Sequence, residues 1–205
     1  MDLFLPCVEM PHFVIDMGLW PYHSPQEKKL LMRQIKLSIF EVRAFGSDKN
    51  LSLVSVPEDL AKKVSKWGFS GGISSEKAEG VNLVLLDPHA DDVLKNVDLN
   101  KRYIIGGIVD KSRRIKTRSL WYDVPRKKLE FCGSTVGVPD RINLLIRILC
   151  ENAKGIPIHK SIINNMPRRE KSERVRMEMS RGKSIPEIAC LLQIPEAEVL
   201  KFTQQ

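Results

Sequence analysis

Short apolar runs and helically spaced apolar residues alternate along the first 150 residues of the chain. Each run is rich in β-branched or aromatic residues and is bounded by turn-forming residues, which is the pattern of a buried strand. The runs that predict strands lie at residues 12–16, 51–56, 81–86, 103–109 and 121–124. Helical spacing between and after these runs predicts helices at residues 24–38, 57–64, 91–94 and 142–149. The first of these helices begins with a capping-box pattern, Ser24-Pro25-Gln26-Glu27.

The alternation of strands and helices predicts an α/β fold, with a parallel sheet covered by helices on both faces. Ligands bind such sheets at the carboxyl ends of the strands. The loops after Leu86, Val109 and Val124 therefore form the candidate site. The chain contains neither G-x-G-x-x-G nor G-x-x-x-x-G-K-[ST], so neither a Rossmann dinucleotide site nor a P-loop is indicated.

The pattern changes after residue 150. The periodicity of apolar positions weakens at residues 151–167, around Gly155 and Pro157, which predicts a linker. Residues 168–179 predict a basic helix, and residues 182–199 predict two short helices around a tight turn, as in a helix-turn-helix. A helical hairpin that only packs on the main domain is the alternative. We expect a main domain, a linker and a C-terminal domain at residues 1–152, 153–167 and 168–205.

Charge is distributed unevenly between the two halves of the chain. Residues 1–100 carry 11 Lys and Arg against 14 Asp and Glu, whereas residues 101–205 carry 22 against 11. Between Lys111 and Lys128 there are eight basic residues and one acid. A basic half beside an acidic half indicates a surface for a polyanion, although a merely solvated basic surface is the alternative.

The cysteines and histidines are too scattered to predict a metal site. Four cysteines and four histidines occur with no C-x-x-C or H-E-x-x-H spacing, so neither zinc nor a disulfide framework is expected. The first residues do not form a basic segment followed by a long apolar stretch, and no apolar run approaches the length of a membrane span. We therefore expect a cytoplasmic protein without a metal or a membrane partner.

The segment from Tyr103 to Arg114 has the strongest candidate chemistry. An apolar run ends on Gly106 and Gly107, where the missing Cβ atoms would let another backbone or a flat ligand approach closely. Asp110 follows among cations, which suits chemistry on an anionic substrate. The alternatives are an ordinary tight turn for the glycines and a structural ion pair with a nearby arginine for Asp110.

Several of these segments together resemble the tRNA position-9 purine N1-methyltransferase family of the SPOUT superfamily, archaeal type. The resemblance covers roughly residues 12–150, and the segments that carry it lie at residues 14–16, 85–94, 103–113, 124–125 and 134–138. It implies a SPOUT-type α/β fold with a C-terminal trefoil knot, S-adenosylmethionine as methyl donor and tRNA as partner. The helix-turn-helix-like tail resembles archaeal members, and the family implies a monomer.

The resemblance also implies site residues. It places S-adenosylmethionine against Leu86, Gly106, Gly107, Val124, Pro125, Arg126, Val136 and Val138, of which the apolar members could instead be ordinary core. Basic residues that flank this site are candidates to hold tRNA phosphates: Lys111, Arg113, Arg114, Arg118, Arg126, Arg168 and Arg169. If the tail mainly contacts phosphates, deleting residues 168–205 should weaken tRNA binding and leave the affinity for the methyl donor unchanged.

Asp110 is the candidate catalytic residue. Guanine N1 carries a proton at neutral pH, so its methylation needs a general base, which Asp110 would supply. Adenine N1 carries no proton, and there the carboxylate would stabilise positive charge or bind the exocyclic amine. The sequence does not choose between them, and the archaeal resemblance slightly favours adenine. The alternative function is a nucleic-acid-binding regulator that uses the helix-turn-helix, with an α/β domain that senses a ligand.

Overall fold

Six parallel strands form one sheet in the computed structural model, which describes residues 9–109, 117–121 and 123–203. Their order across the sheet is β3-β2-β1-β5-β4-β6, and every pairing of neighbouring strands is parallel. The strands are β1 (His12–Asp16), β2 (Leu51–Val54), β3 (Gly72–Ile73), β4 (Leu83–Leu86), β5 (Arg102–Gly106) and β6 (Arg126–Lys127). The parallel α/β sheet predicted from the sequence is therefore confirmed.

Eight α-helices are described beside this sheet, together with the short 3-10 helices η1 (Trp20–Tyr22) and η2 (Asp48–Asn50). The α-helices are α1 (Pro25–Phe45), α2 (Glu58–Ser65), α3 (Thr117–Leu120), α4 (Ile142–Ala153), α5 (Ile158–Asn165), α6 (Arg168–Ser180), α7 (Ile185–Leu192) and α8 (Glu196–Thr203). The predicted capping box begins α1: Glu27 N–H donates to Ser24 Oγ, and Ser24 N–H donates to the Glu27 carboxylate.

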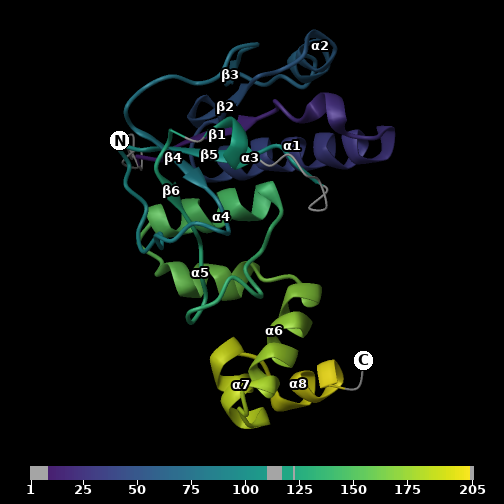
Figure 1. The fold of residues 1–205 in the computed structure, drawn as a ribbon, viewed down its shortest axis with the longest axis vertical. Coiled ribbons are helices and arrows are strands. Elements are labelled where there is room, and N and C mark those ends of the chain that lie inside the picture. The colour runs from purple at the N-terminus through teal and green to yellow at the C-terminus, as the bar shows by residue number, and fades with distance from the viewer. Residues whose placement is uncertain (1–8, 110–116, 122, 204–205) are drawn as a thin grey trace, which may run out of the picture.

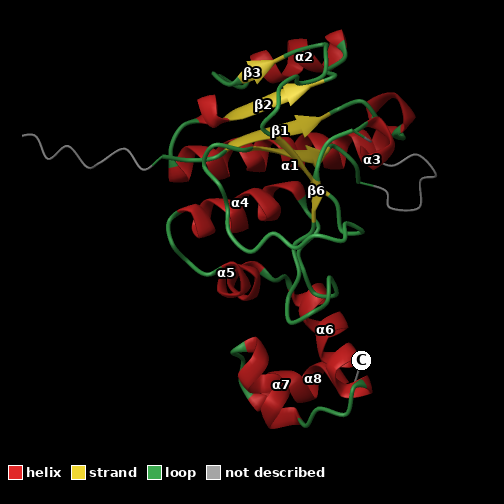
Figure 2. Cartoon of the chain, turned by 60° about the vertical axis from the view of Figure 1, so that its left-hand side comes forward, coloured by secondary structure: helices red, strands yellow, loops and turns green. Residues whose placement is uncertain are grey.

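The two faces of the sheet are covered unequally (Figures 1 and 2). Because side chains alternate along a strand, Phe13 and Ile15 of β1 face the larger core, which α1, α2 and α4 complete. Val14 faces a smaller cluster on the other side, where Trp121 and Leu120 at the end of α3 supply the cover. Helices lie on both faces, as predicted, but on the second face the described helical cover is α3, a helix of four residues.

Two predicted elements differ from the structure. Residues 91–94 are not a helix, because the backbone groups of Asp92 and Leu94 bond instead to Lys128, which follows β6. The strand predicted at residues 121–124 begins later, after Pro125, since Trp121 and Val124 donate their backbone N–H groups locally, to Arg118 O and Trp121 O. Only for residues 91–94 does the bonding partner lie far away in the sequence, where a local pattern gives no information.

The C-terminal helices extend the molecule along its longest axis. Helix α5 lies within the segment predicted as a linker and packs against α4, so that segment is not irregular. Helices α6, α7 and α8 pack together at one end of the molecule, far from α2 and β3 (Figure 1). Where a basic helix and two short helices were predicted, the structure has α6, α7 and α8, with Gln193 in the left-handed conformation at the turn between α7 and α8 (φ 53°).

Candidate active site at the carboxyl edge of the sheet

The carboxyl ends of four strands meet along one edge of the sheet. Asp16 at the end of β1 pairs with Gly106 at the end of β5, and Leu86 at the end of β4 pairs with Lys127 of β6. The loops that leave these strands therefore surround one region of the surface. Several of the residues expected to bind the methyl donor lie at or next to this edge: Leu86, Gly106, Gly107, Pro125 and Arg126.

The two glycines at the end of β5 are required by the fold. A Cβ on Gly107 would lie 2.6 Å from the carbonyl oxygen of Asp16 and 2.7 Å from the sulfur of Met17. A Cβ on Gly106 would collide with Thr117 of α3. Gly107 N–H donates to Asp16 O at 2.8 Å, so the backbone after β5 lies close to the end of β1. The close approach predicted at these glycines is therefore made by the protein's own atoms.

The last residue of β1, Asp16, carries a buried carboxylate. The Asp16 side chain is 2% exposed, and its two oxygens accept hydrogen bonds from Gly18 N–H at 3.1 Å and from the Trp121 indole N–H at 2.9 Å. Trp121 is buried and packs on the second face of the sheet. The sequence showed that a strand ends on an acid, but not that Trp121 satisfies it.

A buried histidine holds the segment that leads to residue 110. His23 Nδ1 lies 2.8 Å from the carbonyl oxygen of Leu19, so this nitrogen carries the hydrogen and donates it. The other ring nitrogen then accepts the N–H of Val109, at 3.3 Å. Asp110 itself lies outside the described residues, as do Lys111, Arg113 and Arg114. Sequence reasoning did not identify His23, because the bonds that it makes to Leu19 O and Val109 N–H involve backbone groups, which a sequence pattern does not reveal.

A second buried acid follows β4 and faces one of the predicted basic residues. Asp87 is 6% exposed; its Oδ1 accepts His89 N–H at 3.0 Å, and its Oδ2 lies 3.4 Å from Arg126 Nη1. Arg126 is exposed on β6, with its side chain 40% accessible.

The loop between β6 and α4 carries Val136 and Val138, the remaining apolar residues expected at the donor. Val136 is 37% exposed and Val138 is half-buried, like Leu86 and Val124 nearer the strands. These apolar side chains are thus not fully covered by protein. Gly137 between them has φ +86°, a conformation that favours glycine, and the loop extends toward α6.

The basic residues expected to bind tRNA are spread over two regions. Arg118 is exposed on α3, beside the sheet, whereas Arg168 and Arg169 are exposed at the start of α6. Figures 1 and 2 show α3 and α6 separated along the long axis of the molecule. The described cations therefore do not form one compact patch.

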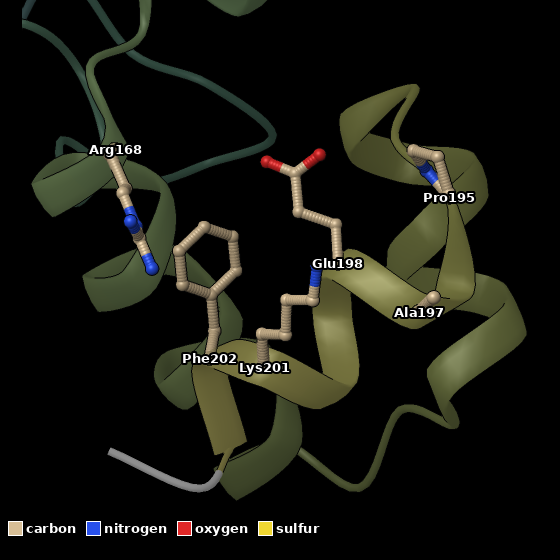
Figure 3. Close-up of a pocket in the computed structure, with 6 residues that line it drawn as sticks. All are labelled: Arg168, Pro195, Ala197, Glu198, Lys201 and Phe202. Carbon is tan, nitrogen blue, oxygen red and sulfur yellow. The ribbon is translucent and has the colours of Figure 1, made fainter.

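The tail carries a shallow hollow between α6 and α8 (Figure 3). The Arg168 guanidinium lies 5.9 Å from the centre of the Phe202 ring, and Lys201 and Glu198 line the same hollow. The carboxylate of Glu198 partly offsets the two cations there.

Within residues 9–109, 117–121 and 123–203, no group of three or more His, Cys, Asp or Glu side chains is placed to hold a metal ion. No helix in this described part is both long and apolar enough to cross a membrane.

Sequence comparison identifies relatives of the chain. The family model described as tRNA (guanine(9)-N(1))-methyltransferase TRM10/TRM10A matches residues 8–119, more than half of the chain. The tRNA (adenine(9)-N1)-methyltransferase of Sulfolobus acidocaldarius is 34% identical over 149 residues, which covers 69% of this chain and 49% of the relative. The tRNA (guanine(9)-/adenine(9)-N1)-methyltransferase of Thermococcus kodakarensis is 33% identical over 158 residues, which covers 69% and 43%. The chain thus spans about half the length of the curated relatives it matches.

Solved structures show the same fold. Trm10 of Sulfolobus acidocaldarius in complex with S-adenosylhomocysteine superposes with a TM-score of 0.80 at 24% identity, covering 96% of this chain and 68% of that one. Dual-specific Trm10 from Thermococcus kodakaraensis superposes with a TM-score of 0.64 at 28% identity, covering 76% and 99%. The first similarity extends over nearly the whole chain, including the C-terminal helices.

Proposed function

The chain belongs to the family of the tRNA (guanine(9)-N(1))-methyltransferase TRM10/TRM10A, and from that premise we propose that it methylates N1 of the purine at position 9 of tRNA. S-Adenosylmethionine is the methyl donor in this proposal. The observation that carries the proposal is the family match over residues 8–119, which spans the carboxyl ends of β1, β4 and β5 and includes Asp110. The regulator alternative finds no support in these comparisons.

Adenine is slightly favoured as the target base, with guanine or both as the other possibilities. One archaeal relative is named for adenine 9 and another for both purines. No described residue distinguishes the two bases.

The residues assigned to the donor suit its adenosine part. Leu86 and Val124 are half-buried and Val136 is 37% exposed, so apolar surface remains available for a flat ring. Gly106, Gly107 and Pro125 would contribute backbone atoms, while Val138 and Arg126 would bound the site. When bound, S-adenosylmethionine supplies an electrophilic methyl group; the chain's own residues orient the reactants and exclude water.

Asp110 acts on the target base. With guanine it accepts the N1 proton, and with adenine it stabilises the positive charge that develops on the ring. The His23–Val109 hydrogen bond supports this proposal, because it anchors the residue next to Asp110 to a buried side chain.

Basic residues hold the tRNA backbone while the target purine leaves its stack. Arg118 and Arg126 are exposed in the main domain, and Arg168 and Arg169 are exposed on the tail. Lys111, Arg113 and Arg114 flank Asp110 in the sequence and belong to the same proposal. We further propose that the α/β domain contains a C-terminal trefoil knot and that the enzyme is a monomer. The proposed domains are residues 1–152 and 168–205, with a connecting segment at residues 153–167.

Methyl transfer to tRNA transcripts tests the proposal. The protein is incubated with methyl-labelled S-adenosylmethionine and three transcripts that differ only at position 9, which is A, G or C. We expect label in the A9 or G9 transcript and none in the C9 transcript, because the N1 of a pyrimidine nucleoside is bonded to the sugar. Equal labelling of all three transcripts would contradict the proposed target.

A further inference from the structure

Arg174 of α6 is a fully buried arginine whose guanidinium enters the loop between β6 and α4. Its side chain is 0% exposed. Nη1 donates to the carbonyl oxygens of Phe131 at 2.6 Å and Val136 at 3.0 Å, and Nη2 lies 3.5 Å from that of Cys132. The guanidinium carbon also lies 4.7 Å from the centre of the Phe131 ring. One side chain of the tail thus contacts three residues of one loop in the main domain.

The charge of Arg174 is balanced within the tail. Nη2 lies 2.5 Å from Glu178 Oε1, and Glu178 is itself 0% exposed. Burial alone would raise the pKa of Glu178, but Lys183 at 2.8 Å and Arg174 outweigh it and hold this pKa below its ordinary value. Glu178 therefore orients the guanidinium, while the guanidinium nitrogens bond to the loop.

Further contacts fix the same loop on α6. A Cβ on Gly137 would lie 3.0 Å from the Cβ of Arg174, so the loop backbone rests directly against the arginine side chain. Ser134 Oγ lies 3.5 Å from the sulfur of Met177, one turn farther along α6. The loop is therefore held by α6 at Phe131, Ser134 and Val136.

From these contacts we infer that Arg174 is a positioning residue for the methyl donor. The inference rests on the proposed function, in which Val136 and Val138 of this loop contact S-adenosylmethionine. By bonding the carbonyl groups of Phe131 and Val136, Arg174 holds both valines where the donor binds. The C-terminal helices are then part of the donor site as well as a candidate tRNA contact.

A packing role alone does not account for this arrangement. A buried ion pair gives little net stability compared with apolar residues of similar volume, so an apolar side chain would pack α6 equally well. Such a side chain could not bond to the loop carbonyls. From the sequence we expected that deletion of residues 168–205 would leave the affinity for the methyl donor unchanged. If Arg174 positions the loop, the same deletion should instead weaken donor binding.

Three variants of the full chain test the inference. Arg174→Met removes the bonds to the loop. Arg174→Met combined with Glu178→Met also removes the buried acid and makes α6 apolar at both positions. Arg176→Met is the matched control, an exposed arginine two residues farther along α6. For each variant we would measure the thermal midpoint, amide hydrogen exchange at residues 131–138 and the dissociation constant for S-adenosylmethionine.

In the double variant we expect an intact thermal transition, faster exchange at residues 131–138 and a donor dissociation constant about tenfold higher, equivalent to about 1.4 kcal/mol. KM for the donor should rise by a similar factor while kcat at saturating donor changes little. Arg176→Met should keep the wild-type donor affinity. Wild-type donor affinity in a folded double variant would overturn the inference and leave the proposed function standing. Absence of donor binding by the wild type would overturn both.

Discussion

The indole Nε1 of Trp121 donates a hydrogen bond to Asp16 Oδ2 over 2.9 Å, and both side chains are buried. The two residues are 105 positions apart in the sequence. Their bond joins the segment after α3 to the carboxyl end of β1, beside the end of β5. The same edge of the sheet carries several of the residues proposed to bind the donor, so this hydrogen bond stabilises the edge at which the donor is proposed to bind.

Replacement of Trp121 by Phe should destabilise the fold. Phenylalanine keeps most of the apolar contacts but removes the indole donor, which leaves a buried carboxylate oxygen of Asp16 without its partner. We expect a loss of about 1–3 kcal/mol in the free energy of unfolding, measured by urea denaturation. Trp67→Phe, at a half-buried position, is the control and should lose less. Equal losses in the two variants would show that the Asp16 bond contributes nothing specific.

Gly107→Ala should disturb the sheet itself. The new Cβ would lie 2.6 Å from the backbone oxygen of Asp16, which cannot move without breaking the β1–β5 pairing. We expect a large fall in the thermal midpoint. Gly46→Ala is the control, because there the nearest atom belongs to the flexible side chain of Met10, at 3.1 Å. A Gly107→Ala protein as stable as the control would show that β1 and β5 can separate at this point.

Asp48 should make stability dependent on pH in acid. Burial would raise its pKa, but hydrogen bonds from Ser70 and Arg43 outweigh this and lower the pKa from 3.8 to about 2. A carboxyl group with a lowered pKa stabilises the folded state above its unfolded pKa, and this contribution is lost as the pH falls through the folded value.

Urea unfolding between pH 5 and pH 2 measures the effect. The free energy of unfolding of the wild type should fall most between about pH 4 and pH 2, and Asp48→Asn should remove part of that fall. Asp59→Asn is the control: the Asp59 side chain is 62% exposed, so its replacement should leave the fall in the free energy of unfolding unchanged. Parallel pH profiles for the wild type and Asp48→Asn would contradict the assignment.

Asp110→Asn separates the two chemistries proposed for the target base. With guanine at position 9, loss of the general base should reduce single-turnover rates by about 10²–10⁴-fold. The residual rate should then climb with pH as guanine N1 ionises unaided. With adenine the loss should be smaller and the profile nearly flat. Asp123→Asn, an exposed acid in the same basic segment, is the control. Unchanged rates on both transcripts would remove Asp110 from the mechanism.

Features that depend on neighbouring residues could be predicted from the sequence. The β1 strand and the start of α1 follow from an apolar run and a capping box, and the structure contains both. The resemblance further indicated the family, because its central segment, residues 103–113, combines two glycines, an acid and cations at fixed spacing.

Features that depend on residues far apart in the sequence could not be predicted. Residues 121–124 have the composition of a strand, but the Trp121 indole bonds to Asp16 on the second face of the sheet. Arg174 and Glu178 have the spacing of an exposed helical ion pair, and only the loop 43 residues earlier shows why they are buried. Gly107 was correctly singled out for close approach, although the approaching atoms belong to β1.

Mapping of the added methyl group on tRNA tests the proposed methyl transfer to N1 of the purine at position 9. Unmodified tRNA is incubated with the protein and S-adenosylmethionine, the product is digested, and the methyl group is located by mass spectrometry. We expect one added methyl group, on the purine at position 9, released as N1-methyladenosine or N1-methylguanosine. A methyl group at another nucleotide, or none on tRNA when donor binding is intact, would contradict the proposal.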